Sequence, residues 1–386
     1  MNPRRLFRIV FAIIAISFGE SRAAQWTNVL NNSDSIPIGV WLQDPHNAER
    51  FKNAGINLYV GLWKGPSTEQ LARLKSAGMP VICSQSQEGL AHKENPLIVA
   101  WMHNDEPDNA QSLGKGKGYG PPILPRKIVD DYQAMRATDP TRPILLNLGQ
   151  GVAWDDYIGR GTRRNHPEDY GEYVKGCDIV SFDIYPAVHE DKEVAGKLEY
   201  VSKGVERLVK WSEDTKQVWN CIECTHIHGK GDGKASPEQI RAEVWMSLIH
   251  GSRGLIYFVH QFEPNFREAA LLDDPVTLGA VTEINRRVQA MAKVLKSAPP
   301  VDQVSVKTDG APIDFITRRD SENLYIFAVC MRNERTQAVF TKAKQPATSW
   351  IEVLDENRHV SWSDDHFSDE FKPYAVHLYK AKIGEF

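Results

Sequence analysis

Acidic residues gather where two apolar runs of the sequence end. The stretch WMHNDEPDN (101–109) ends a hydrophobic run and places three carboxylates, Asp105, Glu106 and Asp108, within four residues. A further carboxylate, Glu223, closes the run QVWNCIE. Two carboxyl groups at one cleft can hydrolyse a glycosidic bond, because one protonates the leaving oxygen while the other attacks the sugar carbon or activates water. Glu106 and Glu223 are therefore the candidate catalytic residues.

Each glutamate also has a structural explanation. Acidic residues beside a proline are common where a helix begins, since they suit the positive end of the helix dipole, and Glu106 stands directly before Pro107. Glu223 follows an apolar run, where an unpaired charge is costly, so an ion pair with a residue such as Arg253 is the alternative. A carboxyl separation of about 5–5.5 Å would indicate retention of anomeric configuration, and about 6.5–9.5 Å inversion.

Eight short apolar runs supply the strands that would bring these residues together. They alternate with amphipathic helical stretches, which is typical of a parallel sheet with helices on its outer face. The units span residues 36–298, close to the usual length of a closed barrel. The sequence therefore predicts an α/β fold, a (β/α)8 TIM barrel. The predicted strands cover residues 36–42, 56–63, 80–85, 97–103, 143–149, 178–186, 217–223 and 254–260.

Local signals mark the helix ends that this alternation requires. Ser67 with Gln70, and Ser236 with Gln239, have the spacing of capping boxes at two predicted helix starts. Gly78 stands where a predicted helix ends before a strand, a position that favours a left-handed glycine. No glycine-rich phosphate-binding loop follows the first predicted strand, which argues against a dinucleotide-binding fold.

The chain changes character after Pro299 and Pro300. Before these prolines strands alternate with helices, whereas after them short alternating runs are separated by turn residues, a pattern typical of antiparallel strands. We therefore predict two domains behind the leader, a catalytic barrel over 36–298 and a small β-sandwich-like domain over 301–386.

Residues 1–24 read as a secretory signal peptide. Arginines precede an apolar stretch that is too short to span a bilayer, and small residues follow it. Removing this segment takes away four arginines and one glutamate, a net charge of +3, so the formal charge would change from −4 to −7. A mildly acidic exported protein is a poor partner for nucleic acid. We expect a secreted or periplasmic protein with no later membrane span.

Polar, aromatic and acidic residues follow the predicted strands. In a closed barrel the loops after the strands converge over one end, and active sites lie there. Flat aromatic rings can stack on sugar rings. Asp183 lies on the same side of its strand as Tyr185, so it could orient a site residue or neutralise Lys64. The predicted substrate-binding residues are Trp41, Trp63, His103, Asn104, Asp105, Tyr185, His226 and His260.

The cysteines and histidines offer other chemistry. Five cysteines are too few for a disulfide-stapled fold, and Cys221 and Cys224 would face opposite sides of an extended strand, so we expect buried thiols. His226 and His228 could bind a metal with Glu223, but such a pair rarely completes a coordination shell. We expect neither a cofactor nor a bound metal.

The chain resembles the clan of retaining (β/α)8 glycoside hydrolases in three short motifs. These are HNDEP around Glu106, IEC around Glu223 and FDIYP around Tyr185. The resemblance implies that Glu106 is the acid/base, that Glu223 is the nucleophile and that Tyr185 donates a hydrogen bond to Glu223. The chain departs from the clan at Asp105, where many members have Asn, and on the eighth strand, where His260 or a nearby residue replaces a tryptophan. No individual family is identified.

The sequence thus predicts an exported retaining glycosidase that acts on a poly- or oligosaccharide. One alternative is a carbohydrate-binding barrel that has lost catalysis, in keeping with Asp105 and the absent tryptophan. Another is a metal-dependent hydrolase that uses His226 and His228. The sugar, its linkage and the oligomeric state are left open by the sequence.

Overall fold

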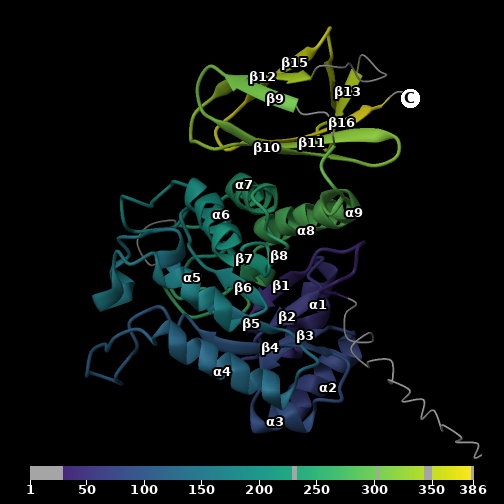
Figure 1. The fold of residues 1–386 in the computed structure, drawn as a ribbon. Coiled ribbons are helices and arrows are strands. Elements are labelled where there is room, and N and C mark those ends of the chain that lie inside the picture. Colours follow the sequence, from purple (N-terminus) through teal and green to yellow (C-terminus); the bar gives the residue numbers. More distant parts are fainter. Residues whose placement is uncertain (1–28, 228–232, 301–303, 343–349, 384–386) are drawn as a thin grey trace, which may run out of the picture.

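A computed structural model describes residues 29–227, 233–300, 304–342 and 350–383. Its first part is a closed barrel of eight parallel strands surrounded by helices, and its second part is a separate β domain (Figure 1). The predicted fold class is confirmed. The barrel strands are β1 (Ile38–Trp41), β2 (Leu58–Val60), β3 (Val81–Ser84), β4 (Ile98–Asp105), β5 (Ile144–Leu148), β6 (Ile179–Phe182), β7 (Gln217–Glu223) and β8 (Gly254–Phe258).

The barrel closes because β1 pairs with both β2 and β8. Gly39 stands opposite Leu58 on one side and Ile256 on the other. Alternate residues of each strand point inward and fill the barrel, among them Trp219 and Trp41. The residues between them face the surrounding helices. This two-residue period decides which side chains at the strand ends can reach the mouth of the barrel.

The helices begin and end largely where local sequence signals place them. Both capping boxes are present, and Gly78 adopts a left-handed conformation with φ 61°. The short α3 was not predicted, because five residues carry too little periodicity. The helices are α1 (Ala48–Asn53), α2 (Thr68–Ala77), α3 (Gln87–Ala91), α4 (Pro125–Thr138), α5 (Asp169–Tyr173), α6 (Glu199–Ser212), α7 (Pro237–Ile249), α8 (Pro275–Ala290) and α9 (Ala292–Leu295). Short 3-10 helices are η2 (Pro45–Asn47), η3 (Gln150–Val152), η4 (Ile158–Arg163), η5 (Val174–Gly176) and η6 (Ala270–Asp273).

The C-terminal domain consists of two antiparallel sheets that enclose one apolar core. One sheet has the order β10-β11-β16-β13-β14 and the other β15-β12-β9. Phe340 from the smaller sheet and Tyr379 from the larger sheet meet in that core, with ring centroids 5.6 Å apart. The strands are β9 (Val304–Thr308), β10 (Ile313–Arg319), β11 (Asn323–Cys330), β12 (Thr336–Lys342), β13 (Trp350–Val353), β14 (Arg358–Ser361), β15 (His366–Phe371) and β16 (Val376–Lys382).

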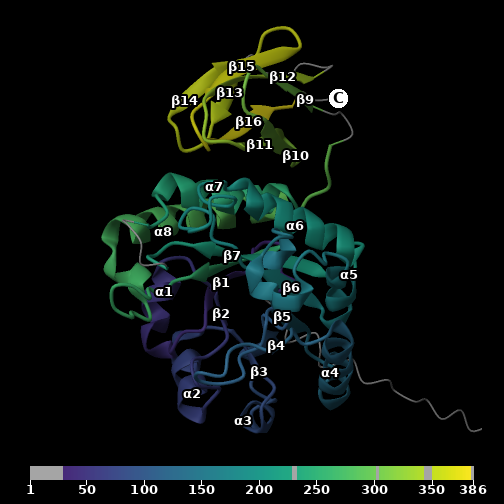
Figure 2. The same cartoon turned by 90° about the vertical axis from the view of Figure 1, so that its left-hand side faces the viewer.

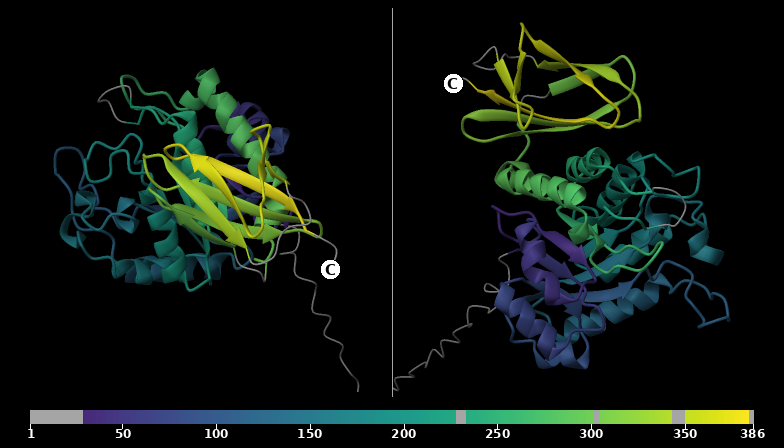
Figure 3. Two further views of the ribbon diagram at one scale, coloured as in Figure 1. Left: turned by 90° about the horizontal axis from the view of Figure 1, so that it is seen from above. Right: turned by 180° about the vertical axis from the view of Figure 1, so that it is seen from behind.

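The C-terminal domain packs against the outer helices of the barrel. Figure 2 shows it resting on α7 and α8, and Figure 3 shows the same arrangement from above and from behind. Trp245 of α7 stacks on Phe327 of β11, with ring centroids 5.3 Å apart. Helix α7 is therefore covered on both sides, by the barrel wall and by the second domain.

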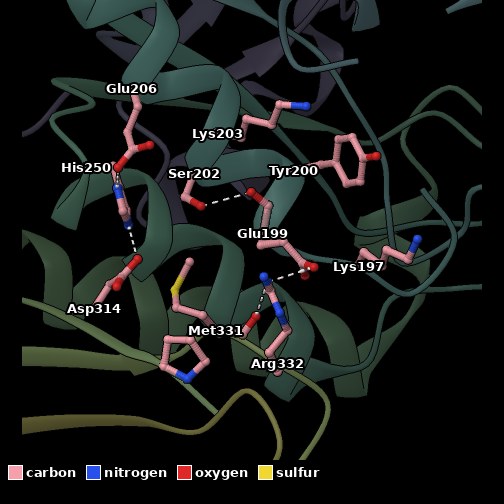
Figure 4. A pocket seen from close by; sticks show the side chains of 11 residues that line it. Lys197, Glu199, Tyr200, Ser202, Lys203, Glu206, His250, Asp314, Met331 and Arg332 are labelled. Carbon is pink, nitrogen blue, oxygen red and sulfur yellow. Dashed lines mark hydrogen bonds and ion pairs between the residues drawn. The ribbon is translucent and has the colours of Figure 1, made fainter. Parts of the chain in front are cut away.

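A cavity of about 590 Å³ lies at this junction (Figure 4). His250 stands between Glu206 at 2.7 Å and Asp314 at 3.1 Å, and Arg332 forms an ion pair with Glu199 at 2.7 Å. The cavity is lined by the outer helices and β strands of the second domain. It is a polar seam between the domains, away from the ends of the barrel strands.

Two further expectations concern cysteines and membranes. All five cysteines are free and buried, as expected. Cys221 belongs to the interior of the barrel and Cys224 to the layer outside it, which confirms that the two thiols face opposite sides of β7. Among the described residues, every helix is too short or too polar to cross a membrane.

Candidate active site

Glu106 follows β4 in an unusual backbone conformation. Its φ is 44°, in the left-handed region that costs a non-glycine residue about 1–3 kcal/mol. Backbone hydrogen bonds hold it there, because its N–H donates to Asn147 at 3.0 Å and its carbonyl accepts from Asn109 at 3.1 Å. A Cβ on Gly149 would lie 2.9 Å from a Glu106 carboxyl oxygen. The missing side chain at Gly149 thus leaves room for the carboxyl group beside β5.

The Glu106 carboxyl group forms a hydrogen bond with the Asp183 carboxyl group beyond β6. Two carboxyl groups can share such a bond only if one of them is protonated. Burial, followed by the charge of Asp183, raises the pKa of Glu106 well above its ordinary value. Burial and the charge of Asp105 raise the pKa of Asp183 to about 7. At neutral pH Glu106 therefore holds the proton, as a general acid must.

Asp105 is tied to the neighbouring strands through an amide. Asn147 donates to Asp105 at 3.0 Å and accepts from the Ser181 hydroxyl at 2.7 Å. Solvent reaches Asp105, although the surrounding protein raises its pKa. Asp105, Asn147 and Ser181 thus form a polar layer across β4, β5 and β6, next to Glu106.

Asp108, the third carboxylate of this segment, has a different task. It is fully buried, and its two oxygens accept from the Gly149 N–H at 2.9 Å and the Tyr170 hydroxyl at 2.8 Å. Arg160 donates to the Asp108 carbonyl at 3.3 Å. Asp108 thus pins the loop after β4 to the end of β5. In this acidic turn Asp108 therefore has a structural role, while the carboxyl group of Glu106 faces the mouth of the barrel.

Tyr185 lies in the mouth beside these acids. Its hydroxyl contacts the Asp183 carboxyl and the Cys221 thiol, and its ring lies 5.2 Å from that of Phe258. Among the described contacts, no hydrogen bond joins Tyr185 to Glu223. The hydrogen bond that the resemblance implied is therefore replaced by one to Asp183.

Glu223 ends β7 and is completely buried, with an exposed fraction of 0%. Its carboxylate oxygens accept hydrogen bonds from the backbone N–H groups of Ala187 at 2.6 Å and Val188 at 3.1 Å. The Glu243 carboxyl of α7 is its third partner. Burial raises the pKa of Glu223 to about 7, while these three hydrogen bonds act in the opposite direction.

The structure places Glu106 and Glu223 at the same end of the barrel but in different surroundings. Asp183 and Asp105 influence the pKa of Glu106, whereas Glu243 is the ionisable side chain that contacts Glu223. The turn at 187–188 covers Glu223. Within the described chain Glu223 has no ion pair, and Arg253, the alternative partner, precedes β8 at the opposite end of the strand.

Aromatic residues line the side of the mouth formed by β8 and the loop after it. His260 lies between Phe258 and Phe262, with centroid distances of 5.1 and 6.3 Å. It is buried, contacts Gln43 at 3.1 Å, and burial lowers its pKa to about 4, so it is neutral. Phe262 and Phe266 are exposed.

The two predicted tryptophans differ sharply in exposure. Trp63 is 45% exposed after β2, whereas Trp41 is 5% exposed and packs inside the barrel. Only Trp63 presents a ring that a sugar could cover. Trp41 is instead part of the apolar core inside the barrel.

Three other predicted residues differ in their surroundings. His103 is buried, and its Nε2 lies 3.2 Å from the carbonyl of Ile128 in α4, so it faces away from the mouth. Asn104 is exposed and borders a depression beside α4. His226 is half-buried, and its carbonyl accepts from the Phe262 N–H at 3.3 Å. The predicted grouping of these three with the acids is therefore wrong for His103.

The metal alternative rests partly on a residue outside the described ranges. His228 lies there, so the predicted pair with His226 is not described. Within the described ranges, no group of three or more His, Cys, Asp or Glu side chains could hold a metal ion.

Several residues around the site were missed from the sequence. Tyr157 reaches the mouth acids, because Glu106 and Asp183 both raise its pKa after burial does. It lies in a long loop without periodicity. Glu243 interrupts the apolar helix pattern RAEVWMSLI. An acidic residue within such a pattern indicates that its side chain is buried against a polar partner. The missed residues are Tyr157, His189, Phe262, Phe266 and Glu243.

Comparisons with known proteins support the fold. No protein-family model matches the chain, and no curated protein matches its sequence. AmyP, solved as a variant with maltotriose, is 9% identical with a TM-score of 0.54, and the match covers 94% of this chain and 99% of AmyP. Gan42B, a GH42 beta-galactosidase from G. stearothermophilus, is 9% identical with a TM-score of 0.56, covering 90% and 98%. At this identity the likeness concerns the fold, and it extends over both domains.

Proposed function

We propose that the chain is a glycoside hydrolase with Glu106 as its general acid/base. The observation that carries the proposal is the contact between the Glu106 and Asp183 carboxyl groups beyond β4 and β6, which form a hydrogen bond that requires a proton. A protonated carboxyl in that position can deliver its proton to a departing glycosidic oxygen. The likeness in fold to enzymes such as a beta-galactosidase agrees with this chemistry.

We further propose a retaining double displacement with Glu223 as the nucleophile. Glu223 ends β7 at the same end of the barrel as Glu106, and two backbone N–H groups favour its ionised form. Asp183 is a poor nucleophile candidate, because hydrogen-bonded carboxyls are closer than the 5–5.5 Å or so that a sugar requires. Since the 187–188 turn covers Glu223, attack requires that turn or the side chain to move.

The burial of Glu223 also favours a second candidate function. A barrel that binds carbohydrate without cleaving it would keep the mouth and leave Glu223 covered. The exposed rings of Trp63, Phe262 and Phe266 suit stacking on sugars in either case. AmyP, which resembles this chain in fold, was solved with maltotriose, so oligosaccharides are the first ligands to try.

A single set of measurements separates these candidates. The purified chain would be incubated with a panel of poly- and oligosaccharides, and the anomeric configuration of the first product would be read by NMR. We expect turnover with retention. Binding without turnover would select the second candidate, and an inverted product would remove Glu223 as nucleophile.

Labelling then tests Glu223 directly. A 2-deoxy-2-fluoro glycoside with a good leaving group should trap the glycosyl-enzyme ester, because fluorine slows its hydrolysis. Mass spectrometry of the digested protein should find the label on the peptide that contains Glu223. A label on the peptide of Asp183 would reassign the nucleophile.

Export of the protein is a separate proposal. It rests on the charge and apolar pattern of residues 1–24, which lie outside the described residues. N-terminal sequencing of protein recovered outside the cytoplasm should find a chain that begins after Ala23 or Ala24. An intact N-terminus on exclusively cytoplasmic protein would contradict export.

A further inference from the structure

Glu243 is an acidic residue in an apolar helix. It is 0% exposed, and its neighbours Val244 and Trp245 are buried as well, because α7 is sandwiched between the barrel and the C-terminal domain. One turn later Ser247 accepts a hydrogen bond from Asn220 of β7 at 2.8 Å. This contact fixes the helix against the strand and places Glu243 against the end of β7, where its carboxyl meets Glu223.

The surroundings of Glu243 provide little that would stabilise a negative charge, since only the backbone N–H of Glu223 lowers its pKa, and burial and the Glu223 carboxyl outweigh that effect. Both of its carboxyl oxygens are buried and receive no other hydrogen bond from an N–H or O–H group of the described residues. The titratable groups that face it are Glu223 and Tyr257, with Cys224 beside them. Lys234, the cation on the loop before α7, is already paired with Asp274. An ionised Glu243 would therefore be a buried charge with little compensation.

Glu223 differs from Glu243 in this respect. Its two oxygens each accept a backbone N–H, so its ionised form has fixed donors. Within the pair, Glu223 is therefore the acceptor and Glu243 the acid. At least one proton on the pair avoids two adjacent negative charges, and the two backbone donors on Glu223 favour the state in which Glu243 holds that single proton.

We propose that Glu243 carries a proton and donates it in a hydrogen bond to the Glu223 carboxylate, so that the buried pair holds one proton and Glu243 positions Glu223. The consequence for catalysis rests on the proposed role of Glu223 as nucleophile. The proton assignment does not, and it is tested without substrate.

Stability provides the first test, through its dependence on pH. In the unfolded chain Glu243 ionises with an ordinary pKa, whereas burial and then Glu223 raise the pKa of Glu243 in the folded chain. The stability that this proton brings is fully present below the unfolded pKa of about 4.3 and is lost as pH rises toward the folded value. Glu243→Gln, which always keeps a donor and never ionises, lacks this dependence.

We therefore expect the Tm of the unchanged protein to fall relative to that of Glu243→Gln between about pH 5 and 8. The infrared spectrum at neutral pH should also lose the contribution of Glu243 to the carbonyl band of protonated carboxylic acids in Glu243→Gln, while the contribution of Glu106 remains. Glu238→Gln, a change at an exposed carboxyl in the first turn of the same helix, is the control and should alter neither measurement. A Tm difference that does not vary with pH, together with an unchanged infrared band, would overturn the proposal.

Activity then tests the positioning role. Glu243→Leu removes the donor at similar volume, so the ionised form of Glu223 loses a partner; kcat/KM should fall at least roughly 10-fold and its acid limb should shift about one unit upward. Glu243→Gln restores a donor and should stay within roughly 3-fold with an unshifted acid limb. Equal losses in both variants, with no shift of the limb, would refute positioning. If no glycan is turned over while the Tm and infrared results hold, the proposed function fails and the shared proton stands.

Discussion

Two pairs of carboxyl groups stand at the same end of this barrel, and they differ in what surrounds them. Glu106 and Asp183 are half-buried residues at the mouth of the barrel. Glu223 and Glu243 are sealed between the barrel wall, α7 and the turn at 187–188. In each pair, burial and then the partner carboxyl raise the pKa of one member, Glu106 in the first pair and Glu243 in the second. A pair of carboxyl groups that share a proton can therefore have two roles. A pair at the mouth can exchange its proton with a substrate, whereas a fully buried pair retains it.

The backbone shows the same contrast. Glu106 has a left-handed backbone conformation, which backbone hydrogen bonds with Asn147 and Asn109 maintain. Such conformational strain is common at functional sites. Glu223 continues a regular strand, and its carboxylate is satisfied by backbone N–H groups. Replacing the accessible carboxyl should therefore change activity far more than stability. Replacing the sealed carboxyl should change both.

The largest expected effect comes from Glu106→Gln, which keeps the volume but removes the acid. We expect kcat/KM to fall by about 10²–10⁴-fold, the usual contribution of a general acid, with Tm unchanged or slightly raised as the crowding of acids is relieved. Steady-state kinetics on the substrate found by the glycan panel measures this. Glu69→Gln, at an exposed carboxyl on α2, should behave like the unchanged protein. A Glu106→Gln enzyme with an ordinary rate would remove Glu106 from catalysis.

The second effect is on stability and separates the two pairs. Glu223→Ala leaves two N–H groups and Glu243 without their acceptor, so the free energy of unfolding should decrease by about 1–3 kcal/mol. Glu106→Ala, at the accessible pair, should stay within about 0.5 kcal/mol of the unchanged protein. Denaturant titration at pH 7 compares them. Equal decreases in the free energy of unfolding would show that the buried pair contributes no more to stability than the pair at the mouth.

The third effect is a shift in pH dependence at the open pair. Asp183 raises the pKa of Glu106, and Glu106 must be protonated to act as an acid, so its pKa sets the alkaline limb of kcat/KM. Asp183→Asn removes that charge, and the limb should move about one unit toward lower pH. The pH profile of kcat/KM measures the limb. A shift toward higher pH would contradict the shared proton at this pair.

The smallest effect concerns sugar binding beside the open pair. Trp63→Ala should raise KM by roughly 3–10-fold at an almost constant kcat, because an exposed ring contributes to binding without touching the proton. Trp350→Ala, at an exposed tryptophan on the C-terminal domain, serves as the control and should leave KM unchanged. A decrease of kcat in Trp63→Ala would mean that this ring also helps to position Glu106.

Much of the fold could be predicted because it depends on local pattern. Alternating apolar runs and amphipathic stretches specified the eight strands, and the capping boxes at Ser67 and Ser236 specified two helix starts. The two-residue period of β6 placed Asp183 and Tyr185 on one face, and the structure confirms their contact.

The same rule failed at β4, for an identifiable reason. Strict alternation would put His103 on the side of Asp105, but the pairing of β4 with β5 is irregular between Met102 and Asp105. His103 still points outward, as Trp101 does, and faces α4, whereas the irregularity turns Asp105 toward Asn147. A change of register within a strand has no reliable signature in the sequence around it.

The sequence by itself determined which acids end the strands and that a parallel barrel would gather those ends, since both follow from the spacing of apolar residues. Only the tertiary structure decided which acid meets which. Glu106, after β4, contacts Asp183, after β6. Glu223, at the end of β7, contacts Glu243 of α7. A proton is shared between groups that are close in space, and the distance along the chain carries no information about that closeness.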